Sequence, residues 1–184
     1  MLYLKYDIGW LSMKKGINMY QYFVNKKMYI DTRKPGEKFE FKEKCYSDTI
    51  FSGYRWDKEA KAENAVFNNC VFSNLGMKCC YFSHVNMSHS IFISCYIKAG
   101  QFRYCDFTGA VFIDCNFDET SFMDCEFQYA QFKGCYIPYE VMKTNLPRKR
   151  HNQNRDLCRN LGLEALHNGD DDNFRKYYFE EKRA

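Results

Sequence analysis

Cys105-Asp106-Phe107-Thr108-Gly109-Ala110-Val111-Phe112 is the stretch of sequence that decides the fold. It contains two phenylalanines five residues apart, Phe107 and Phe112, and each follows a small residue by two positions. The spacing continues in both directions, because every fifth residue over a long central region is large and apolar. The members of this series are Phe67, Phe72, Met77, Phe82, Met87, Phe92, Ile97, Phe102, Phe107, Phe112, Phe117, Phe122, Phe127, Phe132 and Ile137.

A second series lies two residues before the first, and all of its members except Leu75 are small. They are Ala65, Cys70, Leu75, Cys80, Val85, Ser90, Cys95, Gly100, Cys105, Ala110, Cys115, Thr120, Cys125, Ala130 and Cys135. Residues two apart point to the same side of an extended chain. Each unit of five therefore has one large and one small inward residue, and polar residues collect at the other three positions.

The five-residue period excludes an ordinary strand and an α-helix. A strand would continue its alternation with period two, whereas here the phase resets in every unit. A helix turns by about 500° over five residues, so the large residues would spiral around it. The backbone must instead bend once per unit and form a closed coil. Successive coils then stack at about 4.8 Å, large residue on large residue and small on small.

These units resemble the A(D/N)LXX pattern of pentapeptide-repeat proteins, from about Ala65 to Ile137. The resemblance implies a mainly β fold, a right-handed β-helix with four sides and four units per coil. Fifteen units would make just under four coils. Cysteine and phenylalanine stand where the family commonly has alanine and leucine. This departure changes the packing volume and leaves the expected fold intact.

Residues 1–60 do not keep this register. Phe39-Glu40-Phe41 alternates like a strand, and Pro35-Gly36 is typical of a turn. We expect a strand-rich or irregular segment here, with a short helix from about Asp57 to Asn64 that caps the first coil of a tube spanning 65–138.

Residues 139–184 are expected to form a helical hairpin. Helical spacing relates Leu157, Leu161, Ala165 and Leu166. Gly169 should end the first helix, and one of Asp170, Asp171 and Asp172 should cap the second. An aromatic stripe follows at Phe174, Tyr177 and Tyr178. The hairpin could seal the last coil, or it could be a docking element through which two copies form a homodimer.

The cysteines favour packing over metal or redox chemistry. None of the ten is in a C-x-x-C pair, and the five-residue recurrence indicates one repeated structural position for a small apolar side chain. The seven that recur in this way are Cys70, Cys80, Cys95, Cys105, Cys115, Cys125 and Cys135.

The sequence has no apolar run of about 18 residues, so we expect no membrane span. Its first residues lack the apolar core of a secretory signal, and a cytoplasmic location is therefore expected.

Two groups of residues could carry chemistry. His84 and His89 are five apart, near Cys79 and Cys80, and would point outward from different sides of the tube rather than converge on a metal. Acidic residues form the second group. Paired carboxylates can act as acid and base, but a filled tube offers no pocket. We therefore expect no catalytic residue, no metal and no cofactor.

Charge is distributed unevenly along the chain. Residues 61–140 carry eight acidic and five basic residues, a net charge of −3, whereas 1–60 and 141–184 are basic. The cluster Arg148-Lys149-Arg150-His151 could contact phosphates. It has no interleaved aromatic residues for stacking, so nucleic-acid binding is not the favoured interpretation.

The leading hypothesis is a non-enzymatic scaffold that binds an unidentified protein partner. The candidate binding surface consists of Asp106, Glu126, Asp114, Asp118, Glu119, Asp124, Phe174, Tyr177 and Tyr178. Asp106 and Glu126 are twenty apart and should stack one coil apart. The alternative, which the resemblance implies for some members of the family, is inhibition or protection of a type II topoisomerase (gyrase) by DNA mimicry. An enzyme that uses one of the flanks is a third hypothesis.

Overall fold

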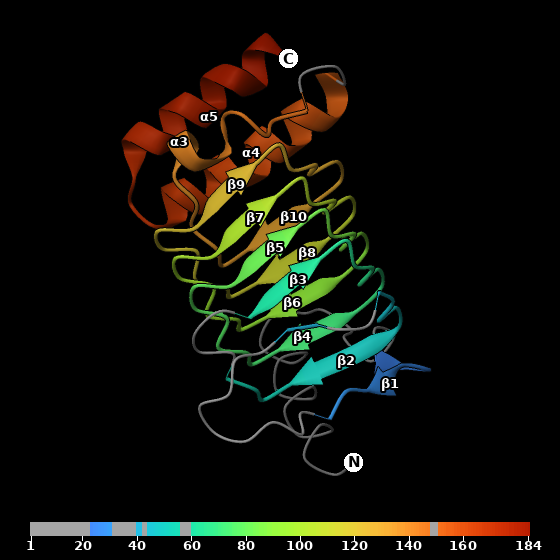
Figure 1. Cartoon of the computed structure of the whole chain (residues 1–184). Coiled ribbons are helices and arrows are strands. Elements are labelled where there is room, and N and C mark those ends of the chain that lie inside the picture. Colours follow the sequence, from blue (N-terminus) through green and yellow to red (C-terminus); the bar gives the residue numbers. More distant parts are fainter. Residues whose placement is uncertain (1–22, 31–39, 42–43, 56–59, 148–150) are drawn as a thin grey trace.

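The structure, a computed structural model, is a tube of stacked coils with helices over one end (Figure 1). It describes residues 23–30, 40–41, 44–55, 60–147 and 151–184.

Two sides of the tube are parallel β-sheets. The β2 side consists, in spatial order, of β1 (Lys27–Met28), β2 (Thr49–Ser52), β4 (Val71–Ser73), β6 (Ile91–Ile93), β8 (Val111–Ile113) and β10 (Gln131–Lys133). The β3 side consists of β3 (Lys61–Glu63), β5 (Tyr81–Ser83), β7 (Gln101–Arg103) and β9 (Ser121–Met123).

The other two sides are held by single parallel bridges between successive coils. The Asp106 side is the ladder Cys45, Val66, Asn86, Asp106 and Glu126. The Tyr96 side is the ladder Arg55, Gly76, Tyr96 and Asn116. Around each coil the order is Asp106 side, β2 side, Tyr96 side and β3 side. The predicted four-sided, mainly β coil is confirmed.

The chain turns each corner through a residue in the left-handed region. Every fifth residue from Asn64 to Gly134 has a positive φ, between 50° and 67°. These residues lie two positions after each large inward residue, so the predicted bend once per unit is confirmed. At Gly109 the corner is also crowded, because a Cβ there would lie 2.6 Å from Nδ1 of His89.

Stacked aromatic rings fill the bore of the tube. In one column the ring centroids of Phe72 and Phe92 are 4.5 Å apart, those of Phe92 and Phe112 4.7 Å, and those of Phe112 and Phe132 4.8 Å. The planes are within 17° of parallel, and all four side chains are buried. The predicted column is confirmed, and Phe51 extends it with a centroid 5.0 Å from that of Phe72.

The tube begins earlier in the chain than the sequence indicated. Coils pair residues twenty apart from β3 onward, but Ile50 pairs with Val71 and Phe51 with Phe72, which are 21 apart. The chain therefore has one extra residue between Arg55 and Ala60. This residue interrupts the five-residue spacing, so the repeat units before it could not be recognised by that spacing. The tube has about five coils, and the expectation of just under four was wrong.

The expected capping helix is also wrong over the part of it that the structure describes. Lys61–Glu63 is strand β3, in register with Tyr81–Ser83 of β5. The remainder of that helix, Phe39 and the turn at Pro35-Gly36 lie outside the described residues. Strand pairing runs across the expected boundary near residue 60, and the division into three segments stays a prediction.

Three helices follow the last coil: α3 (Tyr139–Met142), α4 (His151–His167) and α5 (Asp171–Arg183). Gly169, with φ of 74°, follows α4, and Oδ1 of Asp170 accepts the backbone N–H of Asn173 to cap α5. The two long helices and their junction agree with the sequence pattern, whereas the short α3 has no counterpart in it.

Side-chain amides from this region satisfy the last open edge of the tube. Oδ1 of Asn160 accepts the N–H of Phe132 at 2.7 Å, and Nδ2 of Asn160 donates to the carbonyl of Phe132 at 2.8 Å. Asn145 similarly accepts from the N–H of Cys125 and donates to the carbonyl of Phe122. These amides take the place of a further strand, whose absence would leave an open edge.

Candidate protein-interaction surface

The Asp106 side brings together two of the predicted acidic residues. Asp106 and Glu126 are bridge partners on successive coils, as expected. Asp106 is half-buried and Glu126 is exposed. Oδ1 of Asp106 accepts the backbone N–H of Thr108 at 2.8 Å, and Oε2 of Glu126 accepts from Nε2 of Gln128 at 3.2 Å. Both carboxylates are therefore held in place by their own unit.

The hydrogen bond of Asp106 to Thr108 also explains why polar residues recur at this position. Asn86 makes the same bond to the N–H of Ser88 at 2.9 Å, and Asn116 makes it to the N–H of Asp118 at 2.9 Å. An aspartate or asparagine oxygen here satisfies a backbone donor of the turn. Part of the acidic pattern is therefore structural rather than functional.

Basic residues are absent from four successive rungs of the Asp106 side. No lysine or arginine occupies positions 64–69, 84–89, 104–109 or 124–129, which form the rungs from Val66 to Glu126 with both corners, whereas Lys44 precedes Cys45 at the first rung. Each of the other three sides carries at least one, for example Lys133 on the β2 side. The negative charge of Asp106 and Glu126 consequently has no cation beside it on its own side.

Two exposed tyrosines flank this acidic ladder. Tyr104 is 50% exposed at one corner, where its ring stacks on His84 with centroids 4.8 Å apart. Tyr129 is 65% exposed at the other corner, and its hydroxyl oxygen accepts a hydrogen bond from Nε2 of Gln153 of α4. Neither tyrosine is among the binding residues predicted from the sequence, although counting every fifth residue from Asn64 places both at corners.

The other predicted acidic residues do not all join this surface. Asp124 does, because it occupies the same corner as Tyr104, one coil on. Asp118 lies on the Tyr96 side, and Glu119 lies at the corner beyond it, where it pairs with Lys98 at 2.9 Å. Asp114 is at the corner between the β2 and Tyr96 sides. The acidic surface of the Asp106 side therefore contains Asp106, Glu126 and Asp124, and it is smaller than the predicted one.

The predicted aromatic stripe of α5 is divided between the interior and the surface. Tyr177 is fully buried, and its hydroxyl donates to the carbonyl of Ile137 at 3.0 Å. Phe174 is half-buried, and Tyr178 is 48% exposed. Tyr177 thus attaches the hairpin to the last coil and is inaccessible to a partner. Leu166, placed with the packing residues of α4, is instead 43% exposed.

The comparison with protein families agrees with the geometry of the coils. Residues 101–136 match the family described as pentapeptide repeats (8 copies). This part of the tube consists of pentapeptide repeats. No enzyme family is among the matches.

The chain is similar to solved structures of pentapeptide-repeat form over about half of its length. One is full-length QnrB1, a plasmid-mediated fluoroquinolone resistance protein, with 23% identity, a TM-score of 0.40, and coverage of 50% of this chain and 47% of that one. A trypsin-treated variant of QnrB1 has 22% identity and a TM-score of 0.24, and the coverage is 49% and 54%. The match thus spans about half the length of these proteins. A comparison with curated proteins finds none that matches.

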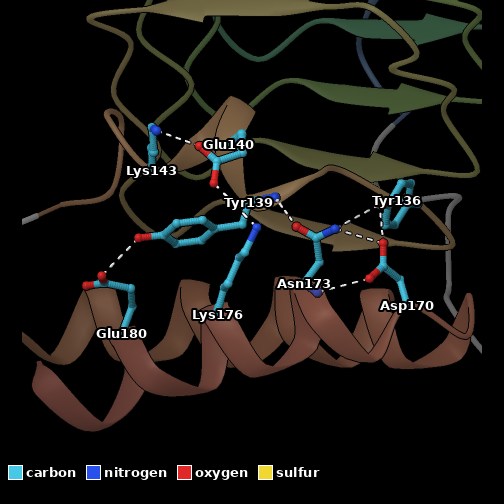
Figure 2. Close-up of polar contacts among 8 residues, drawn as sticks. All are labelled: Tyr136, Tyr139, Glu140, Lys143, Asp170, Asn173, Lys176 and Glu180. Atoms are coloured by element: carbon cyan, nitrogen blue, oxygen red, sulfur yellow. Dashed lines mark hydrogen bonds and ion pairs between the residues drawn. The ribbon is translucent and has the colours of Figure 1, made fainter.

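A polar seam joins the last coil of the pentapeptide-repeat solenoid to α5 (Figure 2). The hydroxyl of Tyr136 donates to Oδ2 of Asp170 at 2.6 Å, and Oδ1 of Asn173 accepts the backbone N–H of Tyr139 at 2.8 Å. Further along, the hydroxyl of Tyr139 donates to Oε1 of Glu180 at 2.9 Å. These bonds attach the helical hairpin to the tube.

The seam shifts the pKa of its members. The backbone N–H of Asn173, the hydroxyl of Tyr136 and the side chain of Asn173 lower the pKa of Asp170 to about 2. Burial, together with Asp170, raises the pKa of Tyr136 to about 12. Burial, together with Glu180, raises the pKa of Tyr139 to about 12. At neutral pH the tyrosines are therefore protonated and donate, and Asp170 is ionised and accepts, which is a structural arrangement.

A pocket of about 450 Å³ lies at this same end of the solenoid. Its lining includes Tyr139, Lys143, His151, Glu180 and Arg183. Several of these groups are engaged within the cap: Tyr139 donates to Glu180, and Lys143 pairs with Glu140. The pocket lies at the C-terminal flank, which is one of the two flanks that the enzyme hypothesis named.

The recurring cysteines of the solenoid are buried and free. The thiols of Cys70, Cys95, Cys105 and Cys125 donate to a backbone carbonyl of the previous coil, as Cys95 does to Phe72 at 3.3 Å. Ser90 and Thr120 use their hydroxyls in the same way, donating to Phe67 and Ile97. Among the described residues no three His, Cys, Asp or Glu side chains are placed to hold a metal. His84 and His89 lie at different corners of the tube.

No helix in the described part of the chain is both long enough and apolar enough to cross a membrane.

Proposed function

We propose that this protein is a non-enzymatic scaffold that binds a protein partner through the Asp106 side of its tube. The observation that carries the proposal is the pair of stacked carboxylates, Asp106 and Glu126, on a side without lysine or arginine in the four rungs from Val66 to Glu126. Because side chains fill the bore, contacts with a partner form on the outer surface. A cytoplasmic location stays a prediction from the sequence.

The arrangement favours a partner with a basic surface. Opposite charges steer association and fix the register between two proteins. Tyr104 and Tyr129 add exposed aromatic rings at the two corners, and aromatic residues are enriched in the central contacts of interfaces. Because the carboxylates are already held by Thr108 and Gln128, little ordering is needed on binding.

Isosteric neutralisation tests this proposal. Asp106→Asn combined with Glu126→Gln removes the charge, and an asparagine oxygen at 106 still accepts the turn N–H, as Asn86 does. Asp118→Asn combined with Glu119→Gln is the matched control on other parts of the tube. Affinity capture from the native cell should recover the same partner with wild type and control, and about tenfold less or none with the first variant. Equal recovery by both variants would contradict the proposal.

DNA mimicry is less well supported as the alternative function. It needs a long and strongly acidic rod. The net charge over 61–140 is −3, and the Asp106 ladder is neutral at Val66 and Asn86. A gyrase supercoiling assay separates the two functions, because inhibition that is lost with Asp106→Asn and Glu126→Gln would favour mimicry.

We also propose that two copies pair through α4 and α5. Leu163, Leu166 and Tyr178 are each more than 40% exposed on these helices, and exposed apolar groups of this kind favour association. Sedimentation equilibrium should detect a dimer, and Leu163→Glu should shift it toward monomer. A wild-type protein that stays monomeric across the micromolar range would contradict this interface.

A further inference from the structure

Cysteines stack on one another along two columns inside the tube. Successive coils pair residues twenty apart, so such residues occupy the same position on neighbouring coils. Cys105 and Cys125 are related in this way and form the thiol pair. Cys95, Cys115 and Cys135 follow one another over three coils and form the thiol row. Within the row, the backbone N–H of Cys115 donates to Sγ of Cys135 at 3.2 Å.

The contacts of the thiol pair repeat from one coil to the next. Sγ of Cys105 donates to the carbonyl oxygen of Phe82 at 3.5 Å, and Sγ of Cys125 donates to that of Phe102 at 3.5 Å. Because the two side chains lie in the same way, their sulfur atoms are about one coil rise apart, about 4.8 Å. The thiols also interact, since a hydrogen bond between them raises the pKa of Cys105 and lowers that of Cys125.

A cation with two ligands in line fits between sulfur atoms at this spacing. The bond between a thiolate and a divalent metal such as zinc is about 2.3 Å long, so two thiolates on opposite sides of one ion are about 4.6 Å apart. This length is close to the coil rise of about 4.8 Å. A disulfide fits less well, because its two Cβ atoms must approach to about 3.8 Å, which is closer than the coil rise.

Ligand number and charge select the kind of cation. Structural zinc takes four ligands, whereas among the described residues no three suitable side chains converge. Thiolates prefer soft cations. A monovalent soft ion between two thiolates would leave a net negative charge in the apolar interior, which is costly, whereas a divalent ion gives a neutral complex. The stacked thiols therefore suit a soft divalent cation that accepts two ligands in line, as Hg²⁺ does.

We propose that the thiol pair and the thiol row each bind one soft divalent cation of the Hg²⁺ type between neighbouring coils. On binding, two S–H bonds break, two sulfur–metal bonds form, and two protons pass to water without any transfer of electrons. The five thiols are at most 5% exposed, so the ion enters slowly, through local opening of the coils.

The spacing in the sequence gave no sign of this site. Metal-binding cysteines are recognised in a sequence when they are clustered at ligand spacing, whereas here the fold brings together residues that are twenty apart. The proposal does not depend on the proposed function, because it concerns the interior of the tube rather than the Asp106 side.

Counting the bound ions tests the proposal. The parent protein carries Cys45→Ser and Cys79→Ser, which remove the exposed thiols. The full chain is incubated with mercury(II) chloride until uptake stops, loosely held metal is removed with a competing monothiol, and native mass spectrometry counts the ions. The parent should retain two ions, each of which replaces two protons in the measured mass.

Serine variants in the parent background assign the ions to the two columns. Serine is tolerated at the small inward position, because Ser90 occupies it and donates to a carbonyl in the same way. Cys105→Ser should retain one ion. Cys105→Ser combined with Cys115→Ser should retain none, since Cys95 and Cys135 are then two coils apart with no thiol between them.

The matched control is Cys80→Ser, which removes a buried thiol that has no thiol neighbour in its column. The residues twenty positions away are Ala60 and Gly100. This variant should retain two ions, as the parent does. Circular dichroism checks that each variant is folded, and alanine, which Ala110 shows to be tolerated at the small inward position, replaces serine in any variant that is not.

Three results would overturn the proposal. The first is a folded parent that retains no ion with loss of two protons. The second is a double variant, at positions 105 and 115, that retains as many ions as the parent. The third is a loss of ions in Cys80→Ser equal to that in Cys105→Ser, because the binding would then not require stacked thiols.

Discussion

At the scale of single residues, the small inward position explains the unusual cysteine content. Its side chain must fit beside a phenylalanine, and a thiol there also donates to a carbonyl of the previous coil, as Cys105 does to Phe82 at 3.5 Å. At Gly100 the slot is too tight for a side chain, since a Cβ there would lie 2.9 Å from the carbonyl oxygen of Ile97. Burial raises the pKa of the Cys70 and Cys80 thiols to about 12, so they stay protonated and unreactive.

Thiol titration should separate buried from exposed cysteines. Of the ten cysteines, Cys45 and Cys79 are exposed and the others are buried. A thiol-reactive disulfide reagent should therefore modify two thiols rapidly in the native protein and all ten in denaturant. The double variant Cys45→Ser with Cys79→Ser should show no rapid phase. Rapid modification of the remaining eight in the native wild type would mean that the small inward position is accessible.

At the scale of elements, the helical cap is held by two kinds of contact. Asn145 and Asn160 replace a missing strand at the open edge, and the seam from Tyr136 to Glu180 attaches α5. An ion pair within the cap adds to this, because Arg159 of α4 contacts the buried Glu181 of α5 at 2.8 Å. The cap therefore continues the hydrogen bonding of the coils rather than merely covering them.

The variant Asn160→Ala tests whether the side-chain amide of Asn160 takes the place of a strand at this edge. It leaves the N–H and carbonyl of Phe132 without their partner and should lower the free energy of unfolding by about 1–3 kcal/mol in a urea titration. The control Asn168→Ala removes an exposed side chain that donates to Glu164 and should change the stability by about 0.5 kcal/mol or less. Similar effects of the two variants would contradict the capping role of Asn160.

Asp170 gives the cap a specific acid sensitivity. Its pKa of about 2 in the folded protein is below the ordinary value of 3.8, so its stabilising effect is present above about pH 4 and is lost as the pH falls toward 2. Asp170→Asn keeps a capping side chain but has no charge to lose. The midpoint temperature of thermal unfolding should fall more steeply between pH 5 and pH 2 for the wild type than for this variant. Parallel curves would show that Asp170 is not responsible.

Some elements could be predicted from the sequence and others could not, and particular residues explain the difference. The central coils could be predicted because Phe67 to Ile137 keep one strict period. The earlier coil was missed because one extra residue after Arg55 moves Phe51 out of that count. The roles of Asn145 and Asn160 could not be predicted, because they depend on how the helices lie against the tube. The division of acidic residues among sides could have been predicted by counting positions within each coil.

At the scale of the whole molecule, the fold assigns its sides to different tasks. The bore is filled with rings, the C-terminal end is closed by helices, and the Asp106 side presents carboxylates between exposed tyrosines. The β2 side is apolar on its outer surface and is buried. The division between bore and outer sides follows from the register, because a shift of one residue would move every inward side chain to the outside.

A double-mutant cycle on Phe92 and Phe112 tests the filled square tube most directly. Their rings stack one coil apart, so replacing both with leucine, singly and together, should give a coupling energy of about 0.5–1.5 kcal/mol in urea unfolding. Phe72 and Phe132 belong to the same column but are three coils apart, and their effects should add to within about 0.5 kcal/mol. Additive effects for Phe92 and Phe112, or equal coupling in both pairs, would contradict the stacked bore on which the account depends.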